Sequence, residues 1–382
     1  MTKNVRLIYL HNFLTDFRPQ WAFLAIYCAQ ITGSYTMGMA VLAVERISSA
    51  LVDIPTGIIS DKIGRKSTIV IGSICTALMA ACYAFAHNPL LLFIGAILSG
   101  LGSSFFSGNN DALLYESLKS KNEEANFHHY QGQTGSMFQL GLGLSALLAS
   151  AIVGDGIRLV FMVGIIPQIL SVIVSLFFEE PKTHIPSEHK SWAQLKQAFG
   201  HISKNRKLRL LTIANAICNG AGEAHFQFIT VFIQSLWPLW GVGIYRALNH
   251  ALGFSGFQLA GRLLDRFKAP YVLVAAESYW FATGCLALVL KNSFSPIIYL
   301  TDAGAFGPFS VARDKILQEE FNDQQRATLG SVVSFTNKLF YGAMLFLIGL
   351  VADRVGIIPA AAFAIGVEAL SLPIYIRLFK GN

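Results

Sequence analysis

Polar residues recur at a spacing of four in two otherwise apolar stretches of the chain. They are Asn12, Asp16 and Gln20 in the first stretch, and Asn215, Asn219 and Glu223 in the second. A spacing of four places side chains on one face of a helix. A charged residue in a membrane helix costs about 2.5–3.5 kcal/mol on insertion scales, so it usually faces water or a partner. Each stretch therefore predicts a helix with a polar face toward a water-filled cavity.

Asp16 is the first candidate for proton transfer in such a cavity. Arg18 follows it closely, and Pro19 has no N–H to donate to the carbonyl of Thr15, which predicts a kink and a loose backbone carbonyl. We expect Asp16 to take and release a proton, with Arg18 favouring its ionised form when the two are paired. The alternative is a permanent Asp16–Arg18 ion pair with a purely structural role.

Other titratable residues in apolar runs are candidates for coupling or for substrate binding. Glu223 and His225 form a second titratable pair, since histidine titrates near neutrality. Arg246 and Lys338 are fixed cations that would favour a substrate with an anionic group, and Asp302 is a buried acid of the same region. Together with the four amide side chains of the two polar faces, these three residues are the expected substrate contacts. The alternative is that the cations only neutralise nearby acids.

Composition indicates a membrane protein. Of 382 residues, 53% are hydrophobic and only 13% are charged, whereas about a quarter of a typical soluble domain is charged. Apolar runs long enough to cross a bilayer as helices recur from end to end, and about twelve of them with their loops account for the whole length. We predict an all-α membrane protein with twelve transmembrane helices. No nucleotide-binding loop or catalytic triad is apparent, so neither enzymatic activity nor a cofactor is expected.

The distribution of basic residues predicts the orientation. With the amino terminus inside, most Lys and Arg residues fall in cytoplasmic segments, and both termini are then cytoplasmic. The formal net charge of +7 thus reflects topology rather than nucleic-acid binding. The five cysteines lie in apolar runs without metal-ligand spacing, so no metal site is expected. We expect a monomer in the cytoplasmic (inner) membrane, whose partners are the lipid bilayer, protons and a small-molecule substrate.

A polar segment divides the chain into similar halves. Residues 179–207 are charged and polar, and they predict a cytoplasmic linker between a bundle at 1–178 and a second bundle at 208–382. The second half repeats the first at an offset of about 203 residues, as in the pair Asn12 and Asn215. Two pseudo-symmetric six-helix bundles follow from this repeat.

A charged, glycine-containing loop lies between the second and third predicted helices. Residues 57–66 read Gly-Ile-Ile-Ser-Asp-Lys-Ile-Gly-Arg-Lys. The defining positions are Gly57, Asp61, Gly64 and Arg65. This spacing resembles the loop signature of the major facilitator superfamily of transporters. Asp265 and Arg266 repeat the loop incompletely in the second half.

The resemblance implies a gating role for the loop. In that family, helices one, four, seven and ten line the cavity, and the loop residues hold its cytoplasmic side closed. Asp61 would then cap the eleventh helix near residues 327 and 328, where the helix dipole favours an anion. Arg65 would meet Asp111 or Glu116 at the inner end of helix four.

The chain departs from the proton-driven drug exporters of this superfamily at two places. Residues 91–106 of the fourth helix carry no charge, whereas those exporters have an arginine there. Ser145 and Ala146 stand where the exporters have Gly-Pro in the fifth helix, although small residues still allow close packing. Both departures weaken an antiporter interpretation.

The predicted function is secondary active transport of a small organic molecule by alternating access. Aromatic residues near the expected cavity favour proton-coupled export of amphipathic compounds. They are Phe13, Phe17, Trp21, Phe105, Phe106, Phe226, Phe228, Phe306 and Phe309. The alternatives are proton-coupled import of an anionic metabolite or a siderophore-like metal chelate, lipid flipping, and sensing without transport.

Overall fold

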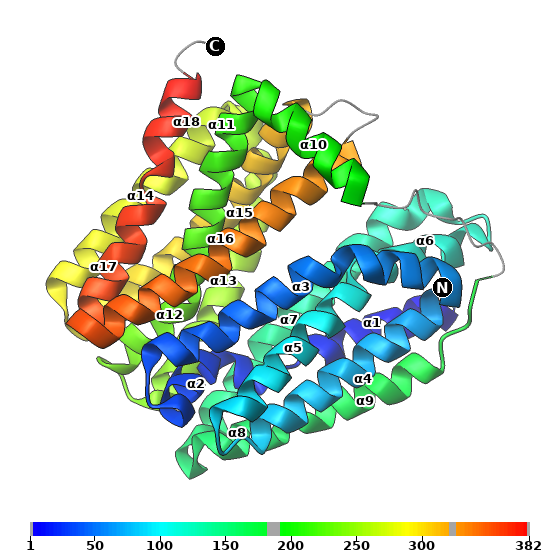
Figure 1. Ribbon diagram of the computed structural model, residues 1–382, viewed down its shortest axis with the longest axis horizontal. Helices are drawn as coiled ribbons and strands as arrows, with labels where there is room; N and C mark the ends of the chain where they lie inside the picture. Colours follow the sequence, from blue (N-terminus) through cyan, green and yellow to red (C-terminus); the bar gives the residue numbers. More distant parts are fainter. Residues whose placement is uncertain (1–2, 182–191, 321–325, 380–382) are drawn as a thin grey trace. The chain divides into compact units, whose positions relative to one another are not determined.

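The computed structural model describes residues 3–181, 192–320 and 326–379, and these parts of the chain form helices without any strand (Figure 1). The helices of the first half are α1 (Lys3–Asp16), α2 (Leu24–Thr32), α3 (Tyr35–Ile63), α4 (Arg65–Ala84), α5 (Pro89–Phe106), α6 (Asn109–Lys119), α7 (Phe127–Ile152), α8 (Ile157–Val163) and α9 (Ile165–Leu176). Those of the second half are α10 (Trp192–Lys204), α11 (Arg206–Asn215), α12 (Gly222–Gln234), α13 (Leu239–Arg266), α14 (Ala269–Leu290), α15 (Ser295–Glu320), α16 (Arg326–Val355), α17 (Ile357–Glu368) and α18 (Ser371–Phe379).

Several helices continue one another across a short break. In the described residues, the pairs α1 and α2, α5 and α6, α8 and α9, α11 and α12, and α17 and α18 each form one interrupted pass. With the uninterrupted helices these make twelve passes, six before α10 and six after it, and the predicted all-α fold is confirmed. The helix α10 lies in the segment that the sequence assigns to the linker.

The chain forms two compact units that differ from the two halves of the sequence. The first unit contains residues 1–24 and 44–190, and the second contains residues 25–43 and 191–382. The end of the first pass and the beginning of α3 therefore belong to the second unit. A division at the linker alone would have placed residues 25–43 in the first unit.

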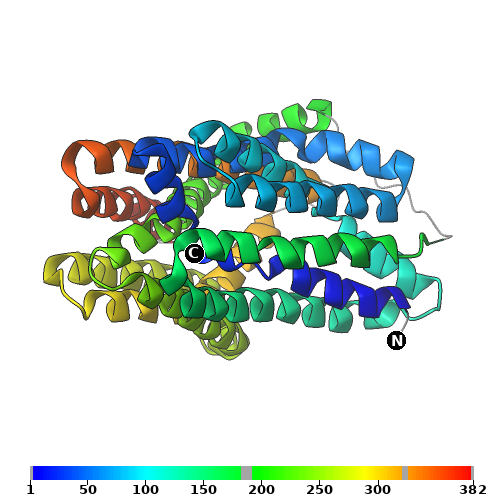
Figure 2. The same cartoon turned by 90° about the horizontal axis from the view of Figure 1, so that it is seen from below.

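Within the first unit, α9 runs alongside α1 and α4 (Figures 1 and 2). Buried apolar side chains from α1, α4 and α6 meet the chain just after α9, where Phe178 is 2% exposed. This cluster fixes the positions of the ends of these helices. The candidate gating loop begins at the same end of α4.

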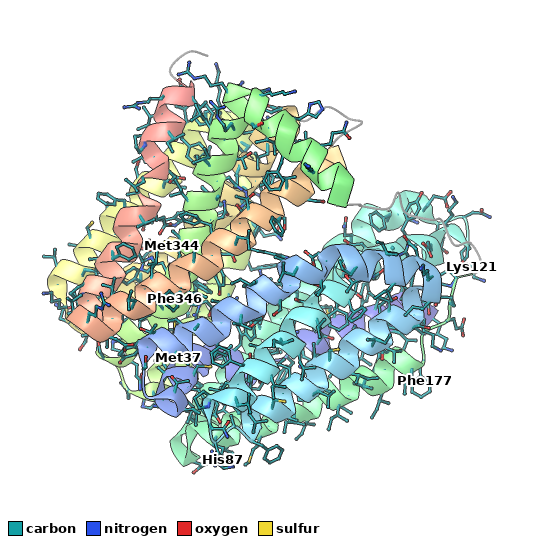
Figure 3. The ribbon with its side chains drawn as sticks, in the orientation of Figure 1. Met37, His87, Lys121, Phe177, Met344 and Phe346 are labelled. Atoms are coloured by element: carbon teal, nitrogen blue, oxygen red, sulfur yellow. The ribbon has the colours of Figure 1, made fainter. Side chains whose placement is uncertain are left out.

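Large apolar side chains remain on the surface of both units. Phe177, just after α9, is 59% exposed, and Phe346 on α16 is 45% exposed, whereas Met344 on α16 is 2% exposed (Figure 3). Such extensive apolar exposure is rare in soluble monomers and is expected of helices that face lipid.

Eight helical stretches of the described chain are long and apolar enough to cross a membrane, judged by length and composition. They belong to passes two to six, nine, eleven and twelve. Passes one and seven are divided into shorter helices, and α13 and α15 are long but more polar. The passes without such a stretch therefore include those that carry Asp16, Arg246 and Asp302.

Candidate functional site

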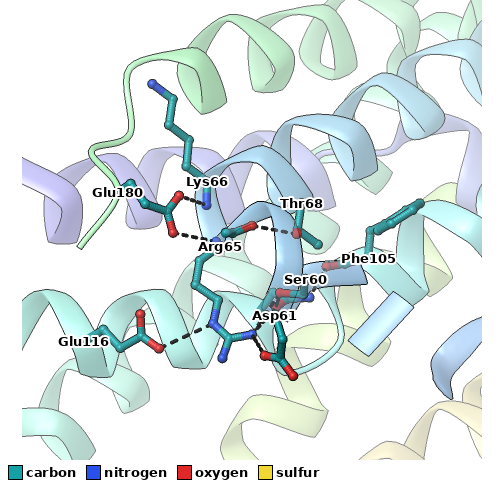
Figure 4. Close-up of polar contacts among 10 residues, drawn as sticks. Ser60, Asp61, Arg65, Lys66, Thr68, Phe105, Glu116 and Glu180 are labelled. Atoms are coloured by element: carbon teal, nitrogen blue, oxygen red, sulfur yellow. Dashed lines mark hydrogen bonds and ion pairs between the residues drawn. The ribbon is translucent and has the colours of Figure 1, made fainter. Parts of the chain in front are cut away.

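The turn between α3 and α4 is built around the buried guanidinium of Arg65 (Figure 4). Its Nη1 lies 3.2 Å from Asp61 Oδ1 and donates to Ser60 Oγ at 2.8 Å and to Asn109 Oδ1 at 3.1 Å. Its Nε lies 3.4 Å from Glu116 Oε1 on α6. The side chains of the arginine and the two acids are at most 6% exposed. This Arg65 node therefore joins the end of α3 to α6, the second part of the fourth pass.

Glu180 completes the Arg65 node from the chain after α9. Its Oε1 accepts from the backbone N–H of Arg65 at 2.6 Å, and its Oε2 accepts from that of Lys66 at 2.8 Å. An acid at this place satisfies free amides at the start of α4 and interacts favourably with the helix dipole. Gly64 has φ +90°, and a Cβ there would lie 2.7 Å from the Glu180 carboxyl carbon. The backbone therefore favours glycine, and a side chain at this position would also displace the Glu180 carboxyl group.

The sequence analysis did not select Glu180. Its only signal was an acid directly after a predicted pass, within a segment assigned to the linker. A cap made by a residue so distant in sequence has no local pattern, so the contact becomes visible only in the fold.

Of the two acids predicted to meet Arg65, the structure places Glu116 beside it, whereas Asp111 is exposed on α6. Asp111 lies in the first turn of α6, and Glu116 lies more than one turn later on a buried face. The other predicted contact, between Asp61 and residues 327 and 328, involves side chains outside the described residues. The gating role of the loop remains a prediction.

The remaining positions of the predicted gate lie on exposed surface. Gly57 is exposed on α3, and a Cβ built there would have no atom within 4 Å. Asp265 and Arg266 are exposed at the end of α13. The incomplete repeat of the motif thus corresponds to a different local structure in the second half.

The first pass is broken where Pro19 follows Asp16. The helix α1 ends at Asp16, and a 3₁₀ turn begins at Pro19. Pro19 has no N–H to donate to the carbonyl of Thr15. This carbonyl instead accepts from Gln168 Nε2 of α9 at 3.3 Å. The predicted kink is therefore a complete break, and a neighbouring helix supplies the lost hydrogen bond.

The side chain of Arg18 forms a hydrogen bond with the same carbonyl, that of Thr15, rather than with the Asp16 carboxylate. Its Nε donates to Thr15 O at 2.6 Å, and its guanidinium carbon lies 5.4 Å from the centre of the Trp21 ring. Its hydrogen bond and its ring contact are thus both made with groups other than the Asp16 carboxylate. The role of Asp16 as proton carrier remains a prediction.

The break changes the polar face predicted for the first pass. Asn12 Oδ1 accepts from Asn110 Nδ2 at 3.3 Å. Gln20 is 1% exposed and packs against Gly164, and neither of its amide atoms has a hydrogen-bond partner in the described part of the chain. Because helical spacing stops at Asp16, the prediction that Gln20 shares the face of Asn12 was wrong.

Pass seven contains a π-helical turn, Ala216–Ala221, between α11 and α12. Asn215 Nδ2 donates to Asn337 Oδ1 of α16 at 3.1 Å, and Asn219 Nδ2 donates to Asn215 Oδ1 at 2.6 Å. Arg313 of α15 in turn donates to Asn219 Oδ1. The structure thus brings the two predicted asparagines together with two residues that the sequence analysis did not select. Turns of this kind are often found at functional sites.

Glu223 and His225 have different surroundings. Glu223 is exposed on α12. His225 Nδ1 lies 3.6 Å from Glu368 Oε2, and its Nε2 lies 3.5 Å from the hydroxyl of Tyr299. The partner of the histidine is therefore an acid on pass twelve, for which the sequence suggested no role.

Arg246 on α13 is 4% exposed. Its Nη2 donates to the backbone carbonyl of Phe226 at 2.8 Å, and its guanidinium carbon lies 3.8 Å from the centre of the Phe226 ring. Its Nε and Nη1 have no hydrogen-bond partner among the described residues. Asp302 accepts from Thr283 Oγ1 at 2.6 Å, and Lys338 is half-buried on α16.

Several aromatic residues predicted near the cavity belong to the core instead. Phe105, Phe228 and Phe309 are at most 8% exposed. Phe306 is 46% exposed, and the rings of Phe13 and Phe17 lie 5.5 Å apart. The aromatic argument for export of amphipathic compounds therefore loses part of its basis.

Asp353, near the end of α16, caps the start of α3 within the second unit. Its Oδ1 accepts from the N–H of Tyr35 at 2.8 Å, and its Oδ2 accepts from the N–H of Thr36 at 2.9 Å. The hydroxyl of Ser34 also donates to Oδ2 at 2.6 Å. This carboxylate satisfies amides that have no helical partner and attaches the start of α3 to pass eleven.

Comparison with known sequences identifies the family. The chain matches the family model of the Major Facilitator Superfamily over residues 13–338. It is 25% identical over 322 residues to a probable 4-methylmuconolactone transporter of Cupriavidus pinatubonensis, covering 79% of this chain and 72% of the relative. It is 24% identical over 268 residues to the quinolone resistance protein NorA of Staphylococcus aureus, covering 65% and 67%. The multidrug resistance protein MdtH of Salmonella typhimurium is 32% identical over 121 residues, 32% of this chain and 28% of that protein.

Solved structures agree with the fold. The nucleoside transporter NupG superposes with a TM-score of 0.83 at 15% identity, over 99% of this chain and all of NupG. The fucose:proton symporter FucP of E. coli superposes with a TM-score of 0.62 at 15% identity, over 98% of both chains. At such identities the likeness concerns the fold alone. The family match and the twelve-pass fold together show that this chain belongs to the Major Facilitator Superfamily, as the loop signature predicted.

Proposed function

We propose that the protein is a secondary active transporter that moves a small organic molecule with an anionic group across the cytoplasmic membrane by alternating access. Protons drive the transport, Asp16 carries them, and export is the direction. Both termini lie in the cytoplasm, in accord with the distribution of basic residues. Membership of a transporter family supports this proposal, and so do relatives whose names refer to a metabolite and to drug resistance.

The proposed substrate class rests on the buried side chain of Arg246 and its hydrogen-bond donors that are unsatisfied within the part of the chain that the structure describes. A buried cation is costly unless it is paired and hydrogen-bonded. Here one nitrogen donates to a backbone carbonyl, the ring of Phe226 lies against the guanidinium, and two further N–H groups have no partner in the described residues. A carboxylate of the substrate would accept from both, in the planar fork geometry that arginine presents.

The acids that could neutralise Arg246 are engaged elsewhere. Asp302 and Glu277 each accept a hydrogen bond from a hydroxyl group, and Glu223 is exposed. In the described part of the chain, Arg246 forms no ion pair. This supports a ligand, rather than a side chain, as the source of the missing negative charge.

Replacing Arg246 with alanine is expected to weaken the binding of organic acids by about 10- to 100-fold, because charge-assisted hydrogen bonds are lost. The measurement is competition binding to purified protein, with a panel of small organic acids and lipophilic cations. Arg246→Lys should recover only part of the affinity, since an ammonium group lacks the fork geometry. Arg262→Ala is the matched control, because Arg262 is an exposed arginine on the same helix. Equal affinity for organic acids in Arg246→Ala and wild type would refute the anionic substrate.

Replacing Asp16 with asparagine is expected to abolish proton coupling while leaving substrate binding unchanged. Inside-out vesicles with an acid interior would be supplied with the best-binding compound while the pH gradient is followed. Collapse of the gradient by wild type but not by Asp16→Asn supports proton-driven export. Collapse by both proteins would remove Asp16 from the coupling. If neither collapses the gradient, uptake with protons in right-side-out vesicles tests import, and competition by lipid would indicate a flippase.

A further inference from the structure

A group of buried titratable side chains lies in the second unit and has no part in the transport scheme above, whereas Asp16 belongs to the first unit. Glu277 on α14 and Glu368 at the end of α17 line one small cavity. The cavity is completed by Trp280, Phe281, Ile365 and Leu372. Two acids thus share a mainly apolar pocket within the membrane-spanning part of the second unit.

Two interrupted helices meet at this pocket. The thiol of Cys218, in the π-helical turn of pass seven, faces Glu277. Pass twelve is interrupted directly after Glu368, where Pro373 has no N–H to donate to the carbonyl of Ala369. Breaks of this kind free space and backbone polar groups, and they are common at functional sites. Both breaks therefore place polar groups where continuous helices would place apolar packing.

The two glutamates differ in their partners. Glu277 is 6% exposed, its Oε2 accepts from Ser371 Oγ at 3.1 Å, and its Oε1 has no hydrogen-bond partner among the described residues. Glu368 lies 3.6 Å from the ring nitrogen of His225. Glu368 therefore has a histidine nitrogen beside it, whereas Glu277 is met only by the hydroxyl of Ser371 and the thiol of Cys218 among the described residues. An isolated carboxylate in such a site is costly, but a neutral carboxyl group is not.

The remaining groups around the pocket do not supply a positive charge to Glu277. The titratable side chains near one or the other glutamate are Cys218, His225, Tyr299, Asp302 and Tyr375. Arg313 lies near Cys218 and Tyr375, and it pairs with Asp314 at 2.8 Å and donates to Asn219. Cys218, Asp302 and the two tyrosines would add only negative charge if ionised.

We propose that Glu277 is a proton-binding site, which holds its proton at neutral pH and so presents a neutral carboxyl group to the pocket that it shares with Glu368. A neutral Glu277 avoids the cost of an isolated carboxylate in these mainly apolar surroundings. Proton binding here is independent of Asp16 and does not rest on the proposed transport. Cys218 of the π-helical turn faces Glu277, so loss of the proton would put a negative charge next to the turn that also carries Asn219.

Infrared spectroscopy of the purified full-length protein at neutral pH tests the proposal. Every glutamate absorbs either as a protonated carboxyl group or as a carboxylate. The wild-type spectrum minus that of Glu277→Gln is expected to contain a protonated carboxyl band that the variant has lost. The matched control is Glu319→Gln, because Glu319 is exposed at the end of α15 and its difference spectrum should contain carboxylate bands.

The proposal is overturned if the Glu277→Gln difference shows carboxylate bands like those of the control. Carboxylate bands that shift on addition of sodium or ammonium ions would assign the pocket to a cation instead, and this also overturns it. If Glu277→Gln does not yield folded protein, Glu277→Asp retains a carboxyl group. A change in the frequency of the same protonated band then supports the assignment, and an unchanged band contradicts it. These readings need no transport, so they are separate from the tests of Arg246 and Asp16.

Discussion

Replacing Arg65 with alanine is expected to destabilise the first unit by about 3–5 kcal/mol, the typical cost of breaking a buried ion pair by removing one partner. The guanidinium lies between Asp61 and Glu116, and all three side chains are almost completely buried. Without it, the two buried acids lose the guanidinium that they share. The unfolding temperature of the purified protein should fall markedly, and transport should fall with it if the Arg65 node is part of the gate.

Lys66→Ala is the control for this experiment. Lys66 is the adjacent basic residue, and its backbone N–H, which alanine retains, makes the bond to Glu180. Its replacement should change the free energy of unfolding by no more than about 0.5 kcal/mol. Arg65→Lys should lie between the two, since lysine keeps the charge but not the fork geometry. An unfolding temperature for Arg65→Ala equal to that of Lys66→Ala would contradict the structural importance of the node.

Replacing Gly307 with alanine is expected to destabilise the second unit by about 1–3 kcal/mol or more, the range typical of overpacking. Gly307 lies where α15 crosses α13, and a Cβ there would approach Phe257 Cα to 2.6 Å. The obstacle is backbone, so no side chain can move aside and the two helices must separate. The gain in helix propensity from glycine to alanine, about 0.5–1 kcal/mol, is too small to offset this. Thermal unfolding of the purified protein gives the comparison.

Gly304 provides a matched control on the same helix. A Cβ built at Gly304 meets no atom within 4 Å. Gly304→Ala should therefore leave stability unchanged or raise it by about 0.5–1 kcal/mol. If both alanine variants unfold at the same temperature, the close contact of α13 with α15 does not limit stability. Small residues at helix crossings commonly permit such contact in membrane proteins.

The fold and the family were predictable because they depend on patterns that are local in sequence. Hydropathy alone indicated twelve passes, and the charged loop with Gly64 and Arg65 indicated the family. Gly64 was recognised from the spacing of the loop, and the structure adds the reason, since its φ is positive, which glycine adopts easily. The choice between Asp111 and Glu116 was not predictable, since both acids lie near one helix end and only the packed face of α6 distinguishes them.

The candidate site was less predictable, because its helices are interrupted. The spacing argument assumed regular helices, and it failed at Gln20 once the first pass broke at Pro19. The π-helical turn likewise alters the direction of side chains after Asn215, so Asn219 meets Arg313 and Glu223 reaches the surface. Contacts such as Glu180 with the start of α4, or Glu368 with His225, join residues more than a hundred positions apart and leave no periodic trace.

The bond between Ser34 and Asp353 spans 319 positions of the chain, and this separation bears on how the protein is made. Residues 25–43 leave the ribosome early, yet the unit to which they belong is completed only when residues 191–382 follow. The start of α3 must therefore wait in the membrane without its cap until nearly the whole protein has been synthesised. Long-range contacts of this kind slow folding and leave incomplete surfaces open to wrong partners. A nascent chain arrested before pass eleven should for this reason be a preferred substrate for membrane chaperones and proteases.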